Sequence, residues 1–198
     1  MIFANYHTHT TFCDGRDTPE QIVQAAYECW QLGAAVVHIH TRAADGKGAM
    51  NTQAFREIVE GIRAHKDCDV IINCTSSGDN RVSGASPEHP ATDEERFLHH
   101  MTVPGIEMGS YDAGSFNWMP GGVFVNSPQF LQKLGDAYLE KGIKPEIEIF
   151  DAGMLGIADY FVKKGHLSTP CHYQFCLGVL GGMPATVENL IYLKDRIP

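Results

Sequence analysis

Apolar stretches suited to β-strands alternate with amphipathic stretches suited to α-helices along most of the chain. The first such pair is "IFANYH" followed by "TPEQIVQAAYECWQLG", in which Thr18 suits a helix N-cap and Pro19 the first helical position. The order repeats, and the pattern predicts about six βα units. The other expected strands are "AAVVHIH", "DVIINC", "IEMGSY", "EIEIFD" and "HYQFCLG", and the other expected helices are "NTQAFREIVEGIRAHK", "TDEERFLHHM", "SPQFLQKLGDAYLEKG", "MLGIADYFVKKG" and "TVENLIYLKDRI".

Strict alternation of strands and helices with short connections favours one parallel sheet with right-handed crossovers. Such a sheet forms either a (β/α) barrel or a doubly wound layer. The sequence contains neither of the glycine-rich nucleotide-binding motifs GxGxxG and GxxxxGK[ST]. We therefore expect a TIM-type (β/α) barrel. No linker or low-complexity stretch divides the chain, so residues 1–198 are expected to form one domain.

The length of the chain changes this expectation. A typical TIM barrel needs about 250 residues, and this chain has 198. We therefore expect an incomplete barrel that lacks roughly the last two βα units. Its first and sixth strands would each present an unpaired edge. Either another chain covers these edges, or the reading frame is truncated or fused.

Composition and charge narrow the class of partner. With 43% hydrophobic and 20% charged residues, the chain is typical of a soluble domain with a real core. Its net charge of -9 provides no basic stripe for phosphate groups, which argues against nucleic acid and anionic membranes. Small molecules are the expected partners. The six cysteines form no CxxC pair, and no secretion signal or membrane-spanning run is recognisable, so we expect a cytoplasmic protein with reduced thiols.

Two histidine pairs carry the most specific chemistry in the sequence. His7 and His9 follow the first expected strand, and His38 and His40 end the second. Side chains at i and i+2 of a strand lie on one face about 6.5 Å apart, so both imidazoles of a pair can bind one cation. If the two strands are parallel neighbours, all four histidines reach the same rim. Imidazole ligands suit Zn²⁺, with Mn²⁺ or Fe²⁺ as alternatives, and hydrogen-bonded histidines without a metal are the other interpretation.

Further polar residues follow the later strands. Glu146 and Glu148 alternate with isoleucines, so both carboxylates lie on one face of their strand. We expect Glu146 to be a solvated residue at the strand start and Glu148 to be functional, because a carboxylate inside a barrel is costly unless paired or liganded. "TSSGD" is either an anion site or a plain polar loop, and Arg42 either pairs with a carboxylate or binds an anion. His99 and His100, near a helix end, are expected to be exposed.

Two family resemblances divide the chain. From about residue 30 to the end it resembles the β-keto acid cleavage enzymes, in the stretches "GAAVVHIHTRAADGK", "DVIINCTSSGD", "GSYDAGSFNW", "VFVNSPQFL", "KPEIEIFDAGML" and "QFCLGVLGGMPATVENLIYL". Residues 1–29 resemble instead the start of polymerase-and-histidinol-phosphatase family phosphoesterases, in which an HxH motif after the first strand binds metal. That likeness rests on "NYHTHTTFCDG".

The longer resemblance implies a metal-dependent enzyme with a TIM-barrel fold and a homo-oligomeric assembly. Such enzymes join a β-keto acid to acetyl-CoA, giving acetoacetate and a new CoA thioester. The resemblance places a Zn²⁺ on His38 and His40. It assigns Thr75 and Ser76 to the substrate carboxylate, Ser110 to another polar contact of the substrate, and Glu148 to its distal polar group. Glu148 and Arg42 are the catalytic candidates.

Two departures from the family leave alternatives open. The family's third metal ligand, a glutamate, and a key arginine come from strands beyond "LKDRIP". In the second departure, "HTHTTFCDG" stands in place of the family's usual first-strand loop and its acidic residue. His7 and His9, in this segment, are candidate replacements for the missing ligand. The alternative functions are a histidinol-phosphatase-like phosphoesterase and an inactive fragment that binds metal.

Overall fold

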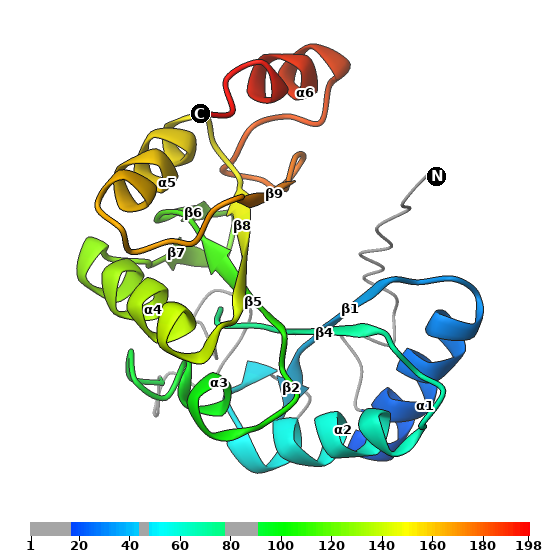
Figure 1. Ribbon diagram of the computed structural model, residues 1–198. Helices are drawn as coiled ribbons and strands as arrows, with labels where there is room; N and C mark the ends of the chain where they lie inside the picture. Colours follow the sequence, from blue (N-terminus) through cyan, green and yellow to red (C-terminus); the bar gives the residue numbers. More distant parts are fainter. Residues whose placement is uncertain (1–16, 44–47, 78–90) are drawn as a thin grey trace.

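A curved, five-stranded parallel sheet forms the centre of the molecule in the computed structural model, which describes residues 17–43, 48–77 and 91–198. The strand order is β1-β4-β5-β8-β9, and helices cover the outer, convex side (Figure 1). The protein is therefore an incomplete (β/α) barrel, as expected from the sequence. The strands of the sheet are β1 (Val36–Ile39), β4 (Ile71–Cys74), β5 (Met108–Asp112), β8 (Lys144–Ile149) and β9 (His172–Phe175).

Local sequence signals begin and end the helices. Thr18 forms a capping box with Gln21 at the start of α1, and Asn51 caps α2 by accepting hydrogen bonds from two backbone N–H groups. Gly142 ends α4 in the left-handed conformation, with φ of 68°. The helices are α1 (Pro19–Gln31), α2 (Thr52–Ala64), α3 (Leu98–Thr102), α4 (Pro128–Lys141), α5 (Gly153–Lys163) and α6 (Val187–Lys194).

The core lies between the sheet and the helices outside it. Alternation along β8 buries Ile147 and Ile149, and along β5 it buries Tyr111, whose hydroxyl donates to the Leu131 carbonyl at 3.1 Å. Gly109, also on β5, leaves space that the Tyr138 hydroxyl and the His100 ring occupy. The other face of the same strands is therefore left to line the inside of the barrel.

Two short antiparallel hairpins interrupt the repeating pattern, and the sequence analysis did not predict them. The pair β2 (Thr41–Arg42) and β3 (Gly48–Ala49) follows β1, and the pair β6 (Phe116–Trp118) and β7 (Gly122–Phe124) follows β5. The helix expected over residues 92–101 is also shorter than predicted, because only α3 is helical there. The expected first strand lies outside the described residues.

The expectation that His99 and His100 are exposed was wrong. They are 0% and 2% exposed, because α3 packs against the end of β4. Their Nε2 atoms lie 3.0 Å from the carbonyl oxygens of Thr75 and Cys74, respectively, and the His99 ring stacks on Phe55. Burial lowers the pKa of His100 to about 3 and the pKa of His99 well below its ordinary value, so both rings are neutral.

None of the helices in the described ranges is long and apolar enough to span a bilayer. The cysteines that the structure describes, Cys29, Cys68, Cys74, Cys171 and Cys176, are all free thiols.

Candidate active site

Polar side chains gather on the inner face of the sheet, toward the carboxyl ends of the strands. The two-residue period of each strand sends apolar side chains outward and brings polar ones together inside. β1 contributes His38, β4 contributes Asn73, and β5 and β8 contribute two residues each. Those four are Ser110, Asp112, Glu146 and Glu148, and all four are buried.

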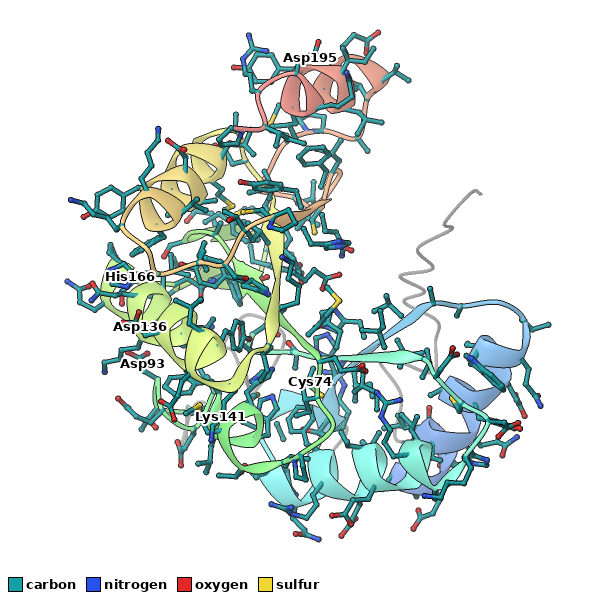
Figure 2. The ribbon with its side chains drawn as sticks, in the orientation of Figure 1. Cys74, Asp93, Asp136, Lys141, His166 and Asp195 are labelled. Atoms are coloured by element: carbon teal, nitrogen blue, oxygen red, sulfur yellow. The ribbon has the colours of Figure 1, made fainter. Side chains whose placement is uncertain are left out.

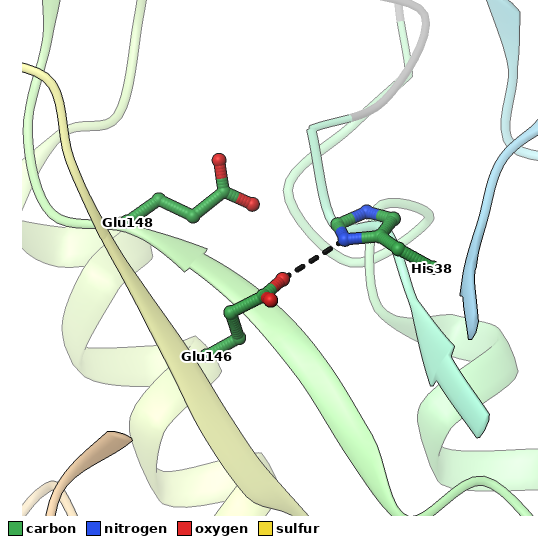
Figure 3. Close-up of side chains that lie close together, drawn as sticks. All are labelled: His38, Glu146 and Glu148. Carbon is green, nitrogen blue, oxygen red and sulfur yellow. Dashed lines mark hydrogen bonds and ion pairs between the residues drawn. The ribbon is translucent and has the colours of Figure 1, made fainter. Parts of the chain in front are cut away.

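His38 and Glu146 point toward each other within this cluster (Figure 3). The Nδ1 atom of His38 lies 2.9 Å from Oε2 of Glu146, across the two strands that separate β1 from β8. The side-chain amide of Asn73, on the intervening β4, donates to the same oxygen at 2.6 Å. A single carboxylate oxygen therefore ties three strands together.

The expectation of a solvated Glu146 was wrong. The residue is 2% exposed, because its position in β8 points it across the inside of the sheet rather than toward solvent. A buried carboxylate needs hydrogen-bond partners, and His38 and Asn73 supply them.

One atom from each of His38, Glu146 and Glu148 lies within 4.8 Å of the other two, an arrangement that could hold a metal ion. His40, the other half of the predicted pair, stacks beside His38 with ring centroids 5.0 Å apart. Imidazole nitrogen and carboxylate oxygen are the donors that zinc accepts in catalytic sites, so these residues fit a divalent cation. His7 and His9 lie outside the described residues.

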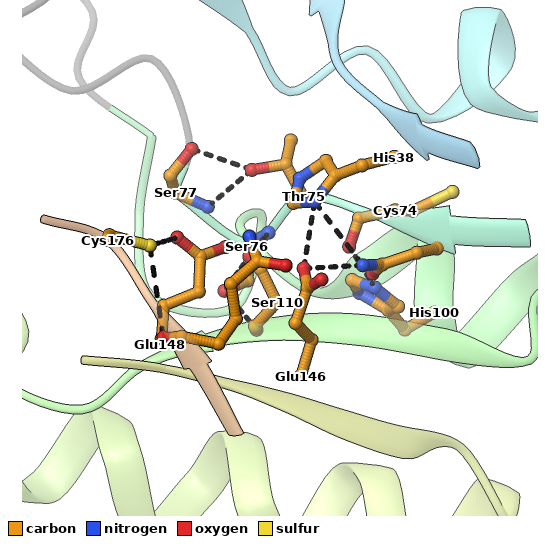
Figure 4. Close-up of polar contacts among 12 residues, drawn as sticks. His38, Cys74, Thr75, Ser76, Ser77, His100, Ser110, Glu146, Glu148 and Cys176 are labelled. Atoms are coloured by element: carbon orange, nitrogen blue, oxygen red, sulfur yellow. Dashed lines mark hydrogen bonds and ion pairs between the residues drawn. The ribbon is translucent and has the colours of Figure 1, made fainter. Parts of the chain in front are cut away.

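Glu148 sits among acidic and thiol groups (Figure 4). Asp112 is its register partner on β5, and the Cys176 thiol donates to Glu148 Oε2 at 3.3 Å. Burial raises the pKa of Glu148 well above its usual range, and the neighbouring charges of Asp112 and Glu146 raise it further. Burial also raises the pKa of Asp112, and the positive charge of Arg96 partly offsets this increase. This part of the site is built to hold a proton or to receive a positively charged group.

A pair of serines forms the next wall of the site. The Ser76 backbone N–H donates to Ser110 Oγ at 2.8 Å, and Ser76 Oγ donates to the Ser110 carbonyl at the same distance. Thr75 Oγ1 lies 2.6 Å from Ser77 Oγ. The buried Arg96 guanidinium donates to the Ser76 carbonyl at 2.9 Å and to Asn126 Oδ1 at 2.6 Å. The predicted residues Thr75, Ser76 and Ser110 are thus brought together.

Arg42 lies in β2, just beyond His40, and its side chain is half-buried. Its catalytic role stays a prediction.

Sequence reasoning missed four contributors: Asn73, Arg96, Asp112 and Cys176. Asn73 is the one polar residue inside "VIINC", and Asp112 lies at an even spacing from Ser110. Both signals could have been read from strand alternation. Arg96 and Cys176 come from segments next to the sheet, and only the tertiary structure brings them to the site.

Comparison with known proteins assigns the chain to a family. The model for beta-keto acid cleavage enzymes matches residues 17–198. The chain belongs to this family. The match starts at residue 17, earlier than the expected residue 30, so it includes α1.

Two curated relatives illustrate the likeness. The chain is 35% identical over 182 residues to a 3-keto-5-aminohexanoate cleavage enzyme of Acetoanaerobium sticklandii, with 91% of this chain and 62% of the relative covered. It is 29% identical over 192 residues to a 3-dehydrocarnitine:acetyl-CoA trimethylamine transferase of Rhizobium meliloti, with 91% and 64% covered. The chain thus spans less than two thirds of either relative.

A solved structure supports the fold. In the ternary complex of ObcA with C4-CoA adduct and oxalate, a region that corresponds to 83% of this chain and 37% of that chain superposes with a TM-score of 0.70 at 21% identity. This likeness concerns the arrangement of strands and helices alone.

Proposed function

We propose that this chain is a metal-dependent β-keto acid cleavage enzyme. In the proposed reaction a carbon–carbon bond of a β-keto acid is cleaved, and the fragments combine with acetyl-CoA to give acetoacetate and a new CoA thioester. Family membership supports the reaction class. The observation that carries the proposal is the gathering of His38, the Ser76–Ser110 pair and Glu148 at one end of one sheet.

His38 and His40, whose rings stack beside each other, are the proposed ligands of a zinc ion. When bound, the metal would supply Lewis-acid chemistry at the keto oxygen. The contribution of the protein is to exclude water and to fix the ligands on rigid strands. The buried Glu146 and Asn73 that contact His38 do both.

The serine pair is the proposed site for the substrate carboxylate. Ser76, Ser110 and Thr75 supply hydroxyl groups, and Arg96 fixes the Ser76 backbone from behind. An anion there would gain hydrogen bonds and a nearby positive charge. Charge-assisted hydrogen bonds of this kind are stronger than neutral ones.

Glu148 and Asp112 are the proposed contacts of the distal end of the substrate. Two adjacent buried carboxyl groups favour a group that donates hydrogen bonds or carries positive charge over a second carboxylate. Both relatives are named after a nitrogen-bearing substrate, 3-keto-5-aminohexanoate in one and 3-dehydrocarnitine in the other. We therefore propose an amino-substituted keto acid as the first substrate to test.

The test is an assay of the purified protein with Zn²⁺, acetyl-CoA and a panel of β-keto acids, alongside phosphate release from phosphomonoesters. Acetoacetate formation, strongest with amino-substituted acids, is the expected result. His38→Ala should abolish it. His166→Ala is the matched control, because His166 lies on the outer, helical side of the sheet, paired with Asp136 (Figure 2). Phosphate release, or no product in either assay, would contradict the proposal.

A further inference from the structure

The contact between His38 and Glu146 constrains the imidazole more tightly than burial alone. Glu146 Oε2 approaches Nδ1, not Nε2, at 2.9 Å. A nitrogen lone pair facing an ionised carboxylate oxygen at that distance would be repelled, so beside an ionised Glu146 the Nδ1 atom carries the hydrogen. In a neutral imidazole the other nitrogen, Nε2, then holds the lone pair.

Asn73 fixes the carboxylate that makes this choice. Its Nδ2 group donates to Glu146 Oε2 at 2.6 Å and lies 3.3 Å from His38 Nδ1. Both N–H groups converge on one oxygen, which explains why the two nitrogens lie so near each other. Asn73 is fully buried and Glu146 almost so, and neither can rotate away without losing a partner in a water-poor interior.

The same geometry disfavours direct binding of a cation at Nδ1. The space between Nδ1 and Oε2 is bordered by the Asn73 amide hydrogens, which carry partial positive charge. A cation placed there would face these hydrogens at close range. A ligand histidine whose second nitrogen donates to a carboxylate is a common arrangement at metal sites, where the carboxylate orients the ring and raises its basicity.

We propose that Glu146 and Asn73 are positioning residues that hold His38 in the tautomer protonated at Nδ1, so that Nε2 is the metal-binding nitrogen. The inference rests on the metal site of the proposed function. The inference specifies which nitrogen of His38 binds the metal, and it gives the buried Glu146 of β8 a role in orienting that ring. Glu148, on the same strand and face, serves the substrate instead.

Nitrogen-15 NMR of the histidine rings in the metal-free protein tests the tautomer directly. At pH 8, His38 of the wild type should show the Nδ1–H tautomer. Glu146→Gln should change it to a mixture or to Nε2–H. Glu148→Gln is the matched control, since it makes the same carboxyl-to-amide change on the same strand and face, and it should leave the His38 tautomer unchanged. An Nε2–H tautomer in the wild type would overturn the inference.

Zinc affinity, measured by competition with a chromophoric chelator, is the second readout. Glu146→Gln should weaken binding by about 10- to 100-fold, the usual effect of losing such an outer partner. Asn73→Ala should weaken it in the same direction without removing a charge. Circular dichroism and thermal melting establish that each variant is folded. In the zinc-loaded protein, the Nε2 resonance of His38 should shift.

The outcomes separate this inference from the proposed function. If the wild type binds no zinc, the proposed function fails. The tautomer measurement still tests whether Glu146 fixes the His38 ring. If it binds zinc through Nδ1, or if Glu146→Gln leaves both tautomer and affinity unchanged, the positioning role alone is wrong.

Discussion

Asp112 and Glu148 lie opposite each other at the ends of adjacent parallel strands, where both carboxyl groups are buried, at 4% and 7% exposure. Burial and mutual repulsion raise the pKa of Glu148, so the pair retains a proton at pH values where an exposed glutamate is ionised. This arrangement gives the inner face of the sheet a charge that depends on pH and on what is bound.

Glu148 should make the metal-free protein less stable as pH rises. An acid whose pKa is higher in the folded state stabilises the fold fully below its unfolded pKa, near 4.3, and loses that contribution as pH rises through the folded pKa. The loss is up to about 1.4 kcal/mol per pH unit for one proton. We expect urea unfolding from pH 5 to 8 to show that the free energy of unfolding of Glu148→Gln increases relative to that of the wild type as pH rises. Parallel pH profiles would contradict this.

The buried His100 should make the protein less stable as pH falls, the opposite of the effect of Glu148. The folded pKa of His100 is about 3, below that of an unfolded histidine near 6.5. Its stabilising contribution is therefore complete above pH 6.5 and is lost as pH falls toward 3. His100→Gln keeps an N–H donor for the Cys74 carbonyl but cannot ionise. As pH is lowered from 7.5 to 5.5, the melting temperature of the wild type should fall more than that of His100→Gln. The control His166→Ala should not show this smaller fall.

Loss of a hydroxyl from the serine pair should weaken binding of the keto acid. Ser110→Ala removes the acceptor for the Ser76 N–H and one proposed contact of the substrate carboxylate. We expect KM for the keto acid to rise about 5- to 30-fold, equivalent to about 1–2 kcal/mol, with little change in KM for acetyl-CoA. Steady-state kinetics with each substrate varied in turn measures this. Ser168→Ala, outside the cluster, is the control, and equal rises in both KM values would argue against a keto-acid contact.

Close packing behind β5 should make Gly109 intolerant of a side chain. A methyl group there would overlap the Tyr138 hydroxyl and the His100 ring. Gly109→Ala should cost about 1–3 kcal/mol of unfolding free energy, as overpacking in a core does. Gly156→Ala is the matched control, because it lies in α5 with open space around it and alanine favours helix. Urea unfolding should show a loss for the first variant and no loss for the second.

The sequence by itself determined the order of strands and helices and much of the inner face of the sheet. Thr18 and Asn51 are capping residues that act within a few residues of their own positions, so their effect can be predicted locally. The same holds for the alternation along β8, which put Glu146 and Glu148 on one face, and for the histidines at the end of β1.

Only the tertiary structure decided how these groups are paired. Glu146 meets His38 from 108 positions away in the chain, and His100 is buried because α3 packs against β4. Burial and partner choice depend on which strands become neighbours and how far each one twists, and a local pattern does not encode either. For this reason the sequence placed Glu146 and Glu148 on one face of their strand and misjudged the surroundings of Glu146, His99 and His100.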